Sequence, residues 1–224
     1  MDDPPGARGA STDRLTLTRQ HYATPFGVLF TDQEVVERLS EVIGPDVAFA
    51  DELHHRREHS LELALVWLHH VRNGAPCLVV PILCGSFHRF VEGRDDPADD
   101  PTLDAVVDVL REVVAARRTL VVASGDLAHM GPAFGGRPLG LVERAQIKVD
   151  DEQLITAMCS GDAGRFFTTL KAQEVRERSV CGTAPLYLMT RVLEPSRGVR
   201  LAYDRCPADE KGMSVVSIAG VAFR

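Results

Sequence analysis

The chain has 224 residues, of which 45% are hydrophobic and 25% are charged, and this length can bury a core without disulfides or structural metals. The formal net charge is −7 and no basic stripe with interleaved aromatic residues is present, which argues against nucleic acid as a partner. No apolar run approaches the roughly 20 residues that span a bilayer. The first 12 residues also lack the pattern of a secretory signal. We therefore expect a cytoplasmic protein with no membrane partner.

The first half of the chain alternates short extended segments with helices. Residues 1–14 are rich in Pro, Gly and Asp, so we expect a disordered leader, followed by one α/β domain over residues 15–224. Short strands are predicted at residues 15–18 and 28–30. Thr31 precedes Glu34 by three residues, the spacing of a capping box, and the apolar residues that follow predict a helix that ends at Gly44. A second helix is predicted over residues 60–71.

Two apolar runs predict strands buried on both faces of a sheet, over residues 76–83 and 119–123, with a helix over residues 103–117 between them. Strand, helix and strand in this order are typical of crossover units. The remaining predicted elements are helices near residues 151–159 and 162–173, a helix after Gly182, and strands over residues 199–203 and 215–223. The expected fold is a central, largely parallel or mixed β-sheet flanked by helices.

Asp126 and His129 follow the predicted strand at residues 119–123 directly. Loops at the carboxyl ends of such strands are where ligands bind in open α/β sheets. If this loop opens into a helical turn, the carboxylate and the imidazole face one cavity, as an acid/base pair or as two metal ligands. The alternative is that Asp126 caps a turn and that His129 is a surface or packed residue.

A histidine-rich segment, residues 54–62, precedes the predicted second helix and holds His54, His55 and His59 with two glutamates. This density suits a metal or acid/base site, whereas the alternative is a solvated, charged helix start. His59 and Glu62 do not form the zinc-protease pattern, which needs two histidines four residues apart.

Five cysteines are widely separated and none forms a C-x-x-C pair, so we expect no disulfide framework. Cys181 stands apart because it precedes a predicted helix start, where Pro185 fits the first turn. The helix dipole favours a thiolate there, which makes Cys181 a better metal ligand or nucleophile than a cysteine of the core.

Five separated strings together resemble the motifs of the Memo family. They occur in the same order as in the family and with approximately the same spacing. They match the family patterns Y-x-T-P-L-G…D, E-H-S-x-E, P-I-L-x-G, S-S-D-x-x-H-x-G and C-G-x-x-P, and they stand at residues 22–32, 58–62, 81–85, 124–131 and 181–185. The resemblance covers nearly the whole chain from Leu15 onward. Each string is weak alone, and the combination is specific.

The resemblance implies the fold of class III (LigB-type) extradiol dioxygenases, with a mononuclear iron or copper site in a cleft. Carried over by position, His59 and Cys181 match metal ligands of the family, and Asp126 and His129 match its adjacent acid/base pair. Imidazole with thiolate suits iron or copper better than magnesium or calcium.

Two departures from the family pattern bear on this expectation. The family's first metal histidine and the strand-helix-strand unit that presents it precede the Y-x-T-P-L-G string, but only residues 1–14 and one short strand precede Tyr22 here. Either the chain is shortened at its N-terminus, or another polypeptide completes the sheet, or metal binding has been lost. His54 or His55 is a substitute ligand by position. Gly125 replaces a family serine and is expected to loosen its loop.

Two functions follow from these features. The first is a metal-dependent oxidoreductase or dioxygenase-like protein that uses iron or copper. The alternative is a binding or assembly protein without chemistry, which recognises a peptide or small molecule in the cleft or joins a modification pathway. For the second we expect a homo-oligomer or a partner chain that completes the exposed edge of the sheet.

Overall fold

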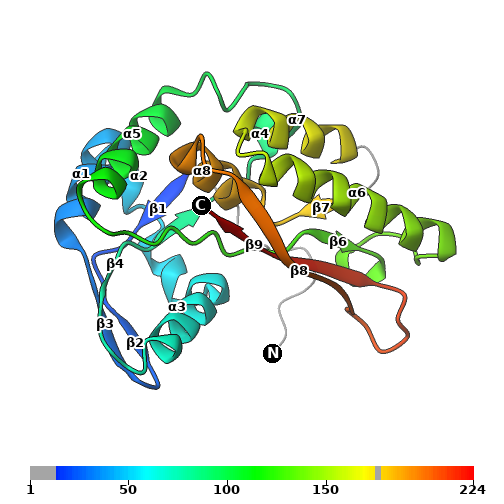
Figure 1. The fold of residues 1–224 in the computed structure, drawn as a ribbon, viewed down its shortest axis with the longest axis horizontal. Coiled ribbons are helices and arrows are strands. Elements are labelled where there is room, and N and C mark those ends of the chain that lie inside the picture. The colour runs from blue at the N-terminus through cyan, green and yellow to red at the C-terminus, as the bar shows by residue number, and fades with distance from the viewer. Residues whose placement is uncertain (1–13, 175–177) are drawn as a thin grey trace. The chain divides into compact units, whose positions relative to one another are not determined.

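The computed structural model describes residues 14–174 and 178–224 and divides into two compact units, residues 1–117 and 118–224 (Figure 1). The expected leader lies outside the described residues except for Arg14, and the expectation of one domain over residues 15–224 stays a prediction. In the described part of the chain, no helix combines the length and the apolar character needed to cross a membrane.

The first unit combines short strands with helices. Its strands are β1 (Leu15–Leu17), β2 (Tyr22–Thr24), β3 (Gly27–Thr31), β4 (Leu78–Val79) and β5 (Ile82–Cys84). Its helices are α1 (Gln33–Ile43), α2 (Pro45–Ala48), the 3-10 helix η1 (Glu52–Arg56), α3 (His59–Val71), α4 (His88–Val91) and α5 (Pro101–Ala116). β1 pairs with β5 in antiparallel register, and β2, β3 and β4 form a second sheet in that order.

Helix α1 begins one residue later than the capping box predicts. The Asp32 side chain, rather than that of Thr31, accepts a hydrogen bond from the backbone N–H of Val35 at 3.3 Å. The same buried carboxylate accepts from Arg117 Nη2 at 2.5 Å. Asp32 is favoured over Thr31 as the N-cap because its carboxylate both caps α1 and pairs with the cationic side chain at the end of α5.

The sheet of β2, β3 and β4 has one buried and one exposed face. Leu29 of β3 and Val79 of β4 pack against Leu65 of α3, which forms the core of this part of the unit. On the opposite face Phe30 and Leu78 are exposed. Successive side chains of a strand point to opposite faces of the sheet, so Leu29 is buried and its neighbour Phe30 is exposed.

The predicted strand at residues 76–83 is wrong as a single element. It forms two short strands in different sheets, because β4 pairs in parallel with β3 whereas β5 pairs in antiparallel register with β1. Pro81 lies between them and cannot donate to a ladder. Leu78 is 60% exposed, so the run is not buried on both faces.

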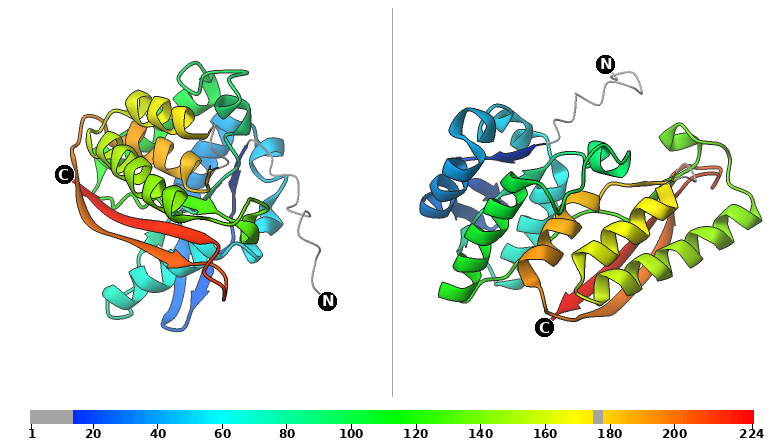
Figure 2. Two further views of the ribbon diagram at one scale, coloured as in Figure 1. Left: turned by 90° about the vertical axis from the view of Figure 1, so that its right-hand side faces the viewer. Right: turned by 90° about the horizontal axis from the view of Figure 1, so that it is seen from above.

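The second unit is a four-stranded antiparallel sheet with helices. It contains β6 (Ala128–Met130), η2 (Pro132–Phe134), α6 (Leu141–Cys159), α7 (Ala163–Glu174), β7 (Ser179–Val180), α8 (Thr183–Leu193), β8 (Gly198–Pro207) and β9 (Val215–Phe223). The strand order is β7, β6, β9, β8. α6 and α7 run side by side, and α6 lies along the β8–β9 ribbon (Figure 2). Ala128, Ile147 and Val215 form the core between β6, α6 and β9.

Two expectations for this unit are corrected. Residues 119–123 are not assigned to a strand in the described structure, and Leu120 and Val122 are exposed. α6 begins at Leu141, ten residues before the predicted start near Asp151. Of the two expected kinds of sheet, largely parallel or mixed, the first is wrong, since β3–β4 is the one parallel pair among the described strands. The sheet of β2, β3 and β4 is mixed, and the other two sheets are antiparallel.

A buried charge network ties α6 to the second unit's sheet. Arg178, just before β7, forms an ion pair with Asp151 of α6, and both side chains are almost completely buried. Tyr203 of β8 donates to the other carboxylate oxygen of Asp151 at 2.8 Å. Burial, followed by the neighbouring Asp151, raises the pKa of Tyr203, so the phenol stays a donor. The network fixes the chain directly before β7.

Two residues of the Tyr22–Gly27 string bind buried histidines. His55 Nε2 lies 3.1 Å from the Thr16 carbonyl, which can only accept, so Tyr22 Oη donates to His55 Nδ1 at 2.7 Å. Thr24 Oγ1 forms a hydrogen bond of 2.7 Å with Nδ1 of buried His69, whose Nε2 lies 3.0 Å from the Gly74 carbonyl. Burial and the nearby Glu58 and Glu62 raise the pKa of Tyr22 to about 12, which keeps its proton in place. The string thus ties β2 to η1 and α3.

Stability should depend on pH through His55. Burial, the largest cause, lowers the pKa of His55 below the ordinary value of about 6.5. The unfolded chain therefore binds the proton more readily than the folded chain. The contribution of His55 to the free energy of unfolding is complete above about pH 6.5 and decreases as the pH falls through the lowered pKa, by at most about 1.4 kcal/mol per pH unit.

Urea unfolding of wild type and of His55→Gln between pH 5 and 8 measures this contribution. We expect the variant to be less stable at pH 7.5 and to lose less stability than wild type on acidification. His54→Gln is the matched control, because His54 is the exposed neighbour. Identical pH slopes for wild type and His55→Gln would contradict the assignment.

Candidate metal centre

The candidate site is built where β6 and β7 pair. In their antiparallel register Ala128 lies opposite Val180. Continuing this register by two residues brings Asp126 opposite Gly182, and the Gly182 backbone N–H donates to the Asp126 carbonyl at 3.1 Å. Two segments more than 50 residues apart in sequence are therefore held together by backbone hydrogen bonds.

Three side chains that can bind a metal converge at this point. One ligand atom each from Asp126, His129 and Cys181 lies within 4.8 Å of the others. Asp126 Oδ2 is 3.5 Å from His129 Nε2, and the backbone N–H of Asp126 donates to Cys181 Sγ at 3.2 Å. Cys181 is exposed, and the side chains of Asp126 and His129 are 47% and 19% exposed. Solutes can therefore reach the cluster.

His129 is positioned by a strand and an aromatic ring. It lies on β6 opposite Ser179 of β7 and Val216 of β9, so its backbone is fixed from both sides. The edge of the Phe134 ring contacts the imidazole, with centroids 4.8 Å apart. The loop does not open into the helical turn that was the condition for Asp126 and His129 to face one cavity, and the two side chains meet instead at the start of a strand.

Cys181 occupies the expected place at a helix start. It directly precedes Gly182, the N-cap of the 11-residue helix α8, and Pro185 lies in the first turn. The positive end of the helix dipole favours a thiolate there. Cys84 contrasts with it, because burial raises the pKa of that thiol to about 12, which leaves it a poor ligand.

The donor set fits a transition metal. Thiolate and imidazole ligands favour copper, iron or zinc over magnesium and calcium, and a carboxylate is a common third ligand. Ligands bound to one ion at about 2.0 to 2.3 Å lie at most about twice that distance apart. The three atoms lie within 4.8 Å of one another, just outside this limit, so they would have to move closer together to bind one ion.

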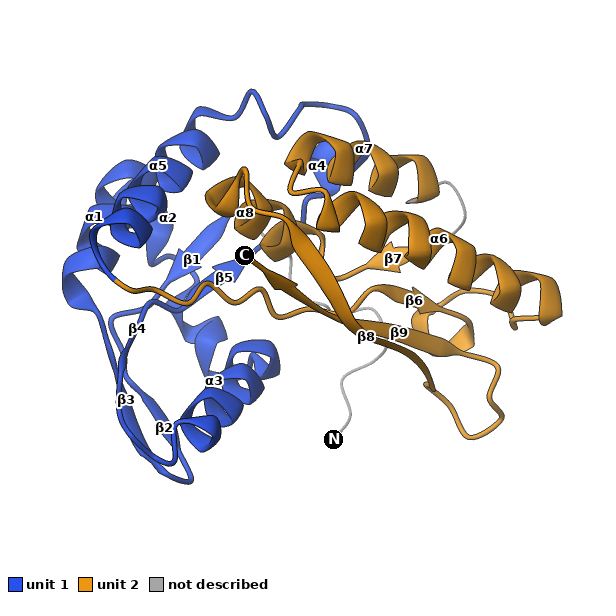
Figure 3. Ribbon diagram, in the orientation of Figure 1, with its two compact units in different colours: residues 1–117 blue, residues 118–224 orange. Residues whose placement is uncertain are grey.

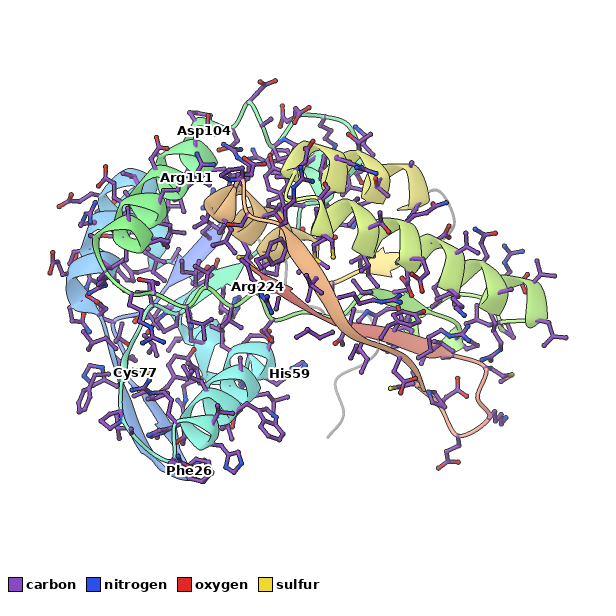
Figure 4. The ribbon with its side chains drawn as sticks, in the orientation of Figure 1. Phe26, His59, Cys77, Asp104, Arg111 and Arg224 are labelled. Carbon is purple, nitrogen blue, oxygen red and sulfur yellow. The ribbon has the colours of Figure 1, made fainter. Side chains whose placement is uncertain are left out.

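His59 belongs to the first unit, whereas the other three predicted site residues belong to the second (Figure 3). It is the first residue of α3, its side chain is 83% exposed, and its Nδ1 lies 3.6 Å from Glu58 Oε1 (Figure 4). Glu58 caps the helix by accepting from the Ser60 backbone N–H at 2.9 Å. Its role as a ligand stays a prediction.

The substitute ligands proposed for the missing family histidine fare differently. His55 is buried and both of its ring nitrogens are engaged by Tyr22 and Thr16, so it is a core histidine and not a ligand. His54 lies on η1, and its side chain is exposed to solvent.

The contact that sequence reasoning missed is between two glycines. A Cβ on Gly125 would lie 2.5 Å from Gly182 Cα, and a Cβ on Gly182 would lie 2.9 Å from the Asp126 carbonyl oxygen. Gly125 therefore permits close packing rather than loosening the loop, which corrects that expectation. The available signal was a glycine beside a site residue in both strings, Gly125–Asp126 and Cys181–Gly182.

Two open grooves lie elsewhere on the units. One of about 750 Å³ lies on α6 and α7, and one of about 690 Å³ is lined by residues such as Arg89, Phe87 and Leu103 of the first unit. Neither is lined by Asp126, His129 or Cys181, so these grooves are separate from the candidate centre.

Comparison with known proteins gives a consistent result. The family model described as Memo-like protein matches residues 5–222. The chain is similar to MEMO1 family proteins of Methanosarcina acetivorans (27% identity, covering 84% of this chain and 61% of the relative) and Archaeoglobus fulgidus (26%, covering 94% and 70%). A MEMO1 family protein of Thermococcus onnurineus is 29% identical over 52% of this chain and 37% of its own length. The chain thus covers only part of each relative, less than two thirds of the first and third and 70% of the second.

Substitution of Gly125 tests the backbone contact beneath the site. Gly125→Ala should lower the free energy of unfolding by about 1 to 3 kcal/mol, because the new methyl group must displace the Gly182 backbone. Gly136→Ala is the control, since its Cβ would meet its nearest neighbour at 3.4 Å, an ordinary contact. Chemical denaturation of both variants provides the measurement. A Gly125→Ala protein as stable as Gly136→Ala would show that the approach is looser than described.

Proposed function

The chain belongs to the Memo-like protein family, and from this premise we propose that it is a protein with a mononuclear iron or copper site and a redox or oxygenase-like role. The observation that carries the proposal is the convergence of Asp126, His129 and Cys181, whose ligand atoms lie within 4.8 Å of one another. The fold that the Memo resemblance implies, that of class III extradiol dioxygenases, supports the same class of chemistry.

Each residue has a proposed role. Cys181 supplies a thiolate ligand, and His129 supplies an imidazole held in place by β7, β9 and Phe134. Asp126 is the third ligand. His59 is proposed as a further ligand from the first unit, by position in the family pattern. A bound iron or copper ion would supply a redox-active Lewis-acidic centre.

Asp126 and His129 also have a proton-handling role in the proposal. The carboxylate is 3.5 Å from His129 Nε2 and about half exposed, so it can orient the imidazole and exchange protons with water. Sequence reasoning assigns them as an acid/base pair beside the metal, whereas the geometry favours their binding it directly. The metal affinity of variants at Asp126 and His129 distinguishes direct metal binding from a purely acid/base role.

The alternative function is a binding or assembly protein that performs no chemistry and recognises a peptide or a small molecule. The observation in its favour is the segment at residues 119–123, which has strand-like sequence but is not assigned to a strand in the described part of the chain. Leu120 and Val122 are 72% and 58% exposed there. Such a segment suits β-strand addition by another chain.

Metal titration of the full chain tests the proposed function. We expect metal-depleted protein to bind one Fe²⁺ under anaerobic conditions, or one Cu²⁺, in equilibrium dialysis with elemental analysis. Cys181→Ser, His129→Gln and Asp126→Asn should each raise the Kd at least about tenfold, since each removes one ligand atom. His59→Gln should do the same if His59 completes the site.

Cys206→Ser and His54→Gln are matched controls, because both residues are exposed and lie outside the cluster. They should leave the Kd unchanged. Loss of binding in Cys181→Ser and His59→Gln alone would return Asp126 and His129 to a purely acid/base role. Failure of the wild type to bind either metal would overturn the metal proposal and leave the binding or assembly function.

A further inference from the structure

Helix α3 exposes an aromatic and apolar patch on the side that faces away from its own core. We define the α3 patch as Phe26, Leu63, Trp67 and His70. Leu63 and Trp67 are 55% and 66% exposed, and Phe26 is 46% exposed. Trp67 is the single tryptophan of the chain. Large exposed side chains of these types are typical of interaction sites.

The members of the α3 patch are contiguous. The Trp67 and His70 rings contact each other with centroids 5.7 Å apart, and the His70 and Phe26 rings with centroids 5.5 Å apart. Leu63 lies one helical turn before Trp67 on the same face. Phe26 comes from the turn between β2 and β3, which lies at the end of α3 (Figure 4).

The opposite face of α3 is already occupied. Leu65 packs against Leu29 and Val79, and His69 is buried against Thr24. α3 therefore carries apolar side chains on two faces, whereas a surface helix normally presents polar residues outward. The second face suits a protein partner because it combines a tryptophan with neighbouring apolar side chains, the composition of interface hot spots.

The arrangement of polar residues on α3 favours a second copy of the chain as the partner, because an imidazole can donate a hydrogen bond to a carboxylate. The first turn is acidic, with exposed Glu62, and the last turn contains exposed His70. Glu62, Val66 and His70 follow each other at four-residue intervals along one flank of the helix. In an antiparallel pair of identical helices this flank meets itself, so that Glu62 of each copy faces His70 of the other.

One two-fold axis satisfies the apolar and the polar pairs together. The midpoint of Leu63 and Trp67 is residue 65, and the midpoint of Glu62 and His70 is residue 66, which differ by about 1.5 Å along the helix. An axis near Val66 therefore sets Trp67 of one copy against Leu63 of the other while it pairs Glu62 with His70. A two-fold interface requires this kind of self-complementary surface.

We propose that the α3 patch is the interface of a homodimer, formed by antiparallel packing of α3 against α3 of a second copy. None of Asp126, His129 and Cys181 belongs to the patch, whereas His59, the further ligand proposed above, is the first residue of the same helix. The proposed dimer assigns a specific surface to the homo-oligomer that sequence reasoning expects.

Sedimentation equilibrium of the full chain is the first test, with the fluorescence of Trp67 as a second readout. We expect wild type to sediment at twice its monomer mass of 24.5 kDa at micromolar concentration. Dilution should shift the Trp67 emission to the red as the monomer forms. Leu63→Asp should raise the dimer Kd at least about tenfold, and Leu201→Asp, an exposed leucine of β8, is the matched control.

A charge exchange tests the antiparallel geometry. Glu62→Lys and His70→Glu should each raise the dimer Kd at least about fivefold, and the double variant should return it to within about twofold of wild type. Circular dichroism checks that each variant is folded. A wild type that stays monomeric at 100 µM with red-shifted emission would overturn the proposal and point to a different partner. A dimer that Leu63→Asp leaves intact, or single variants that the double does not rescue, would overturn it as well.

Discussion

The candidate site depends on one backbone contact, the approach of Gly125 to Gly182 beyond the paired ends of β6 and β7. Side chains at either position would push the two segments apart, because there is no room for a Cβ between them. With the contact in place, the backbone N–H of Asp126 reaches Cys181 Sγ and the carbonyl of Asp126 receives Gly182. A carboxylate, an imidazole and a thiol are thereby held on rigid backbone rather than on a free loop.

The surrounding elements keep this contact in register. β6 is an inner strand of its sheet, flanked by β7 and β9, so His129 cannot slide without breaking both ladders. The other strand of the contact, β7, follows Arg178, which is bound to Asp151 of α6 in the interior. Removing one partner of such a buried pair leaves a buried charge, which costs several kcal/mol. Stability of α6 and geometry of the site are therefore linked.

The sequence predicts most helices of this chain because their signals are local. α3, α5, α7 and α8 lie close to the predicted ranges, and Cys181 lies at the predicted helix start. The strands are predicted less accurately, because a strand exists only where a distant segment pairs with it. Residues 119–123 have strong strand propensity but form no strand in the described structure, and residues 76–83 divide between two sheets.

The site shows the same division between local and distant information. Asp126, His129 and Cys181 could be named from motifs, yet their meeting depends on an antiparallel register that no local pattern encodes. His55 illustrates the converse, because a histidine in a dense polar segment suggested a ligand and proved to be buried between Tyr22 and Thr16. Burial and hydrogen-bond partners, not residue type, distinguish His55 from His129.

X-ray absorption at the iron or copper edge of the metal-loaded protein tests the central claim most directly. If Cys181 and its neighbours form one centre, the spectrum of wild type contains a sulfur scatterer at about 2.3 Å together with nitrogen or oxygen scatterers at about 2.0 to 2.2 Å. The sulfur scatterer should disappear in Cys181→Ser and persist in Cys206→Ser. A wild-type spectrum with nitrogen and oxygen ligands alone would contradict the account, because the ion would then be bound away from the junction of β7 and α8.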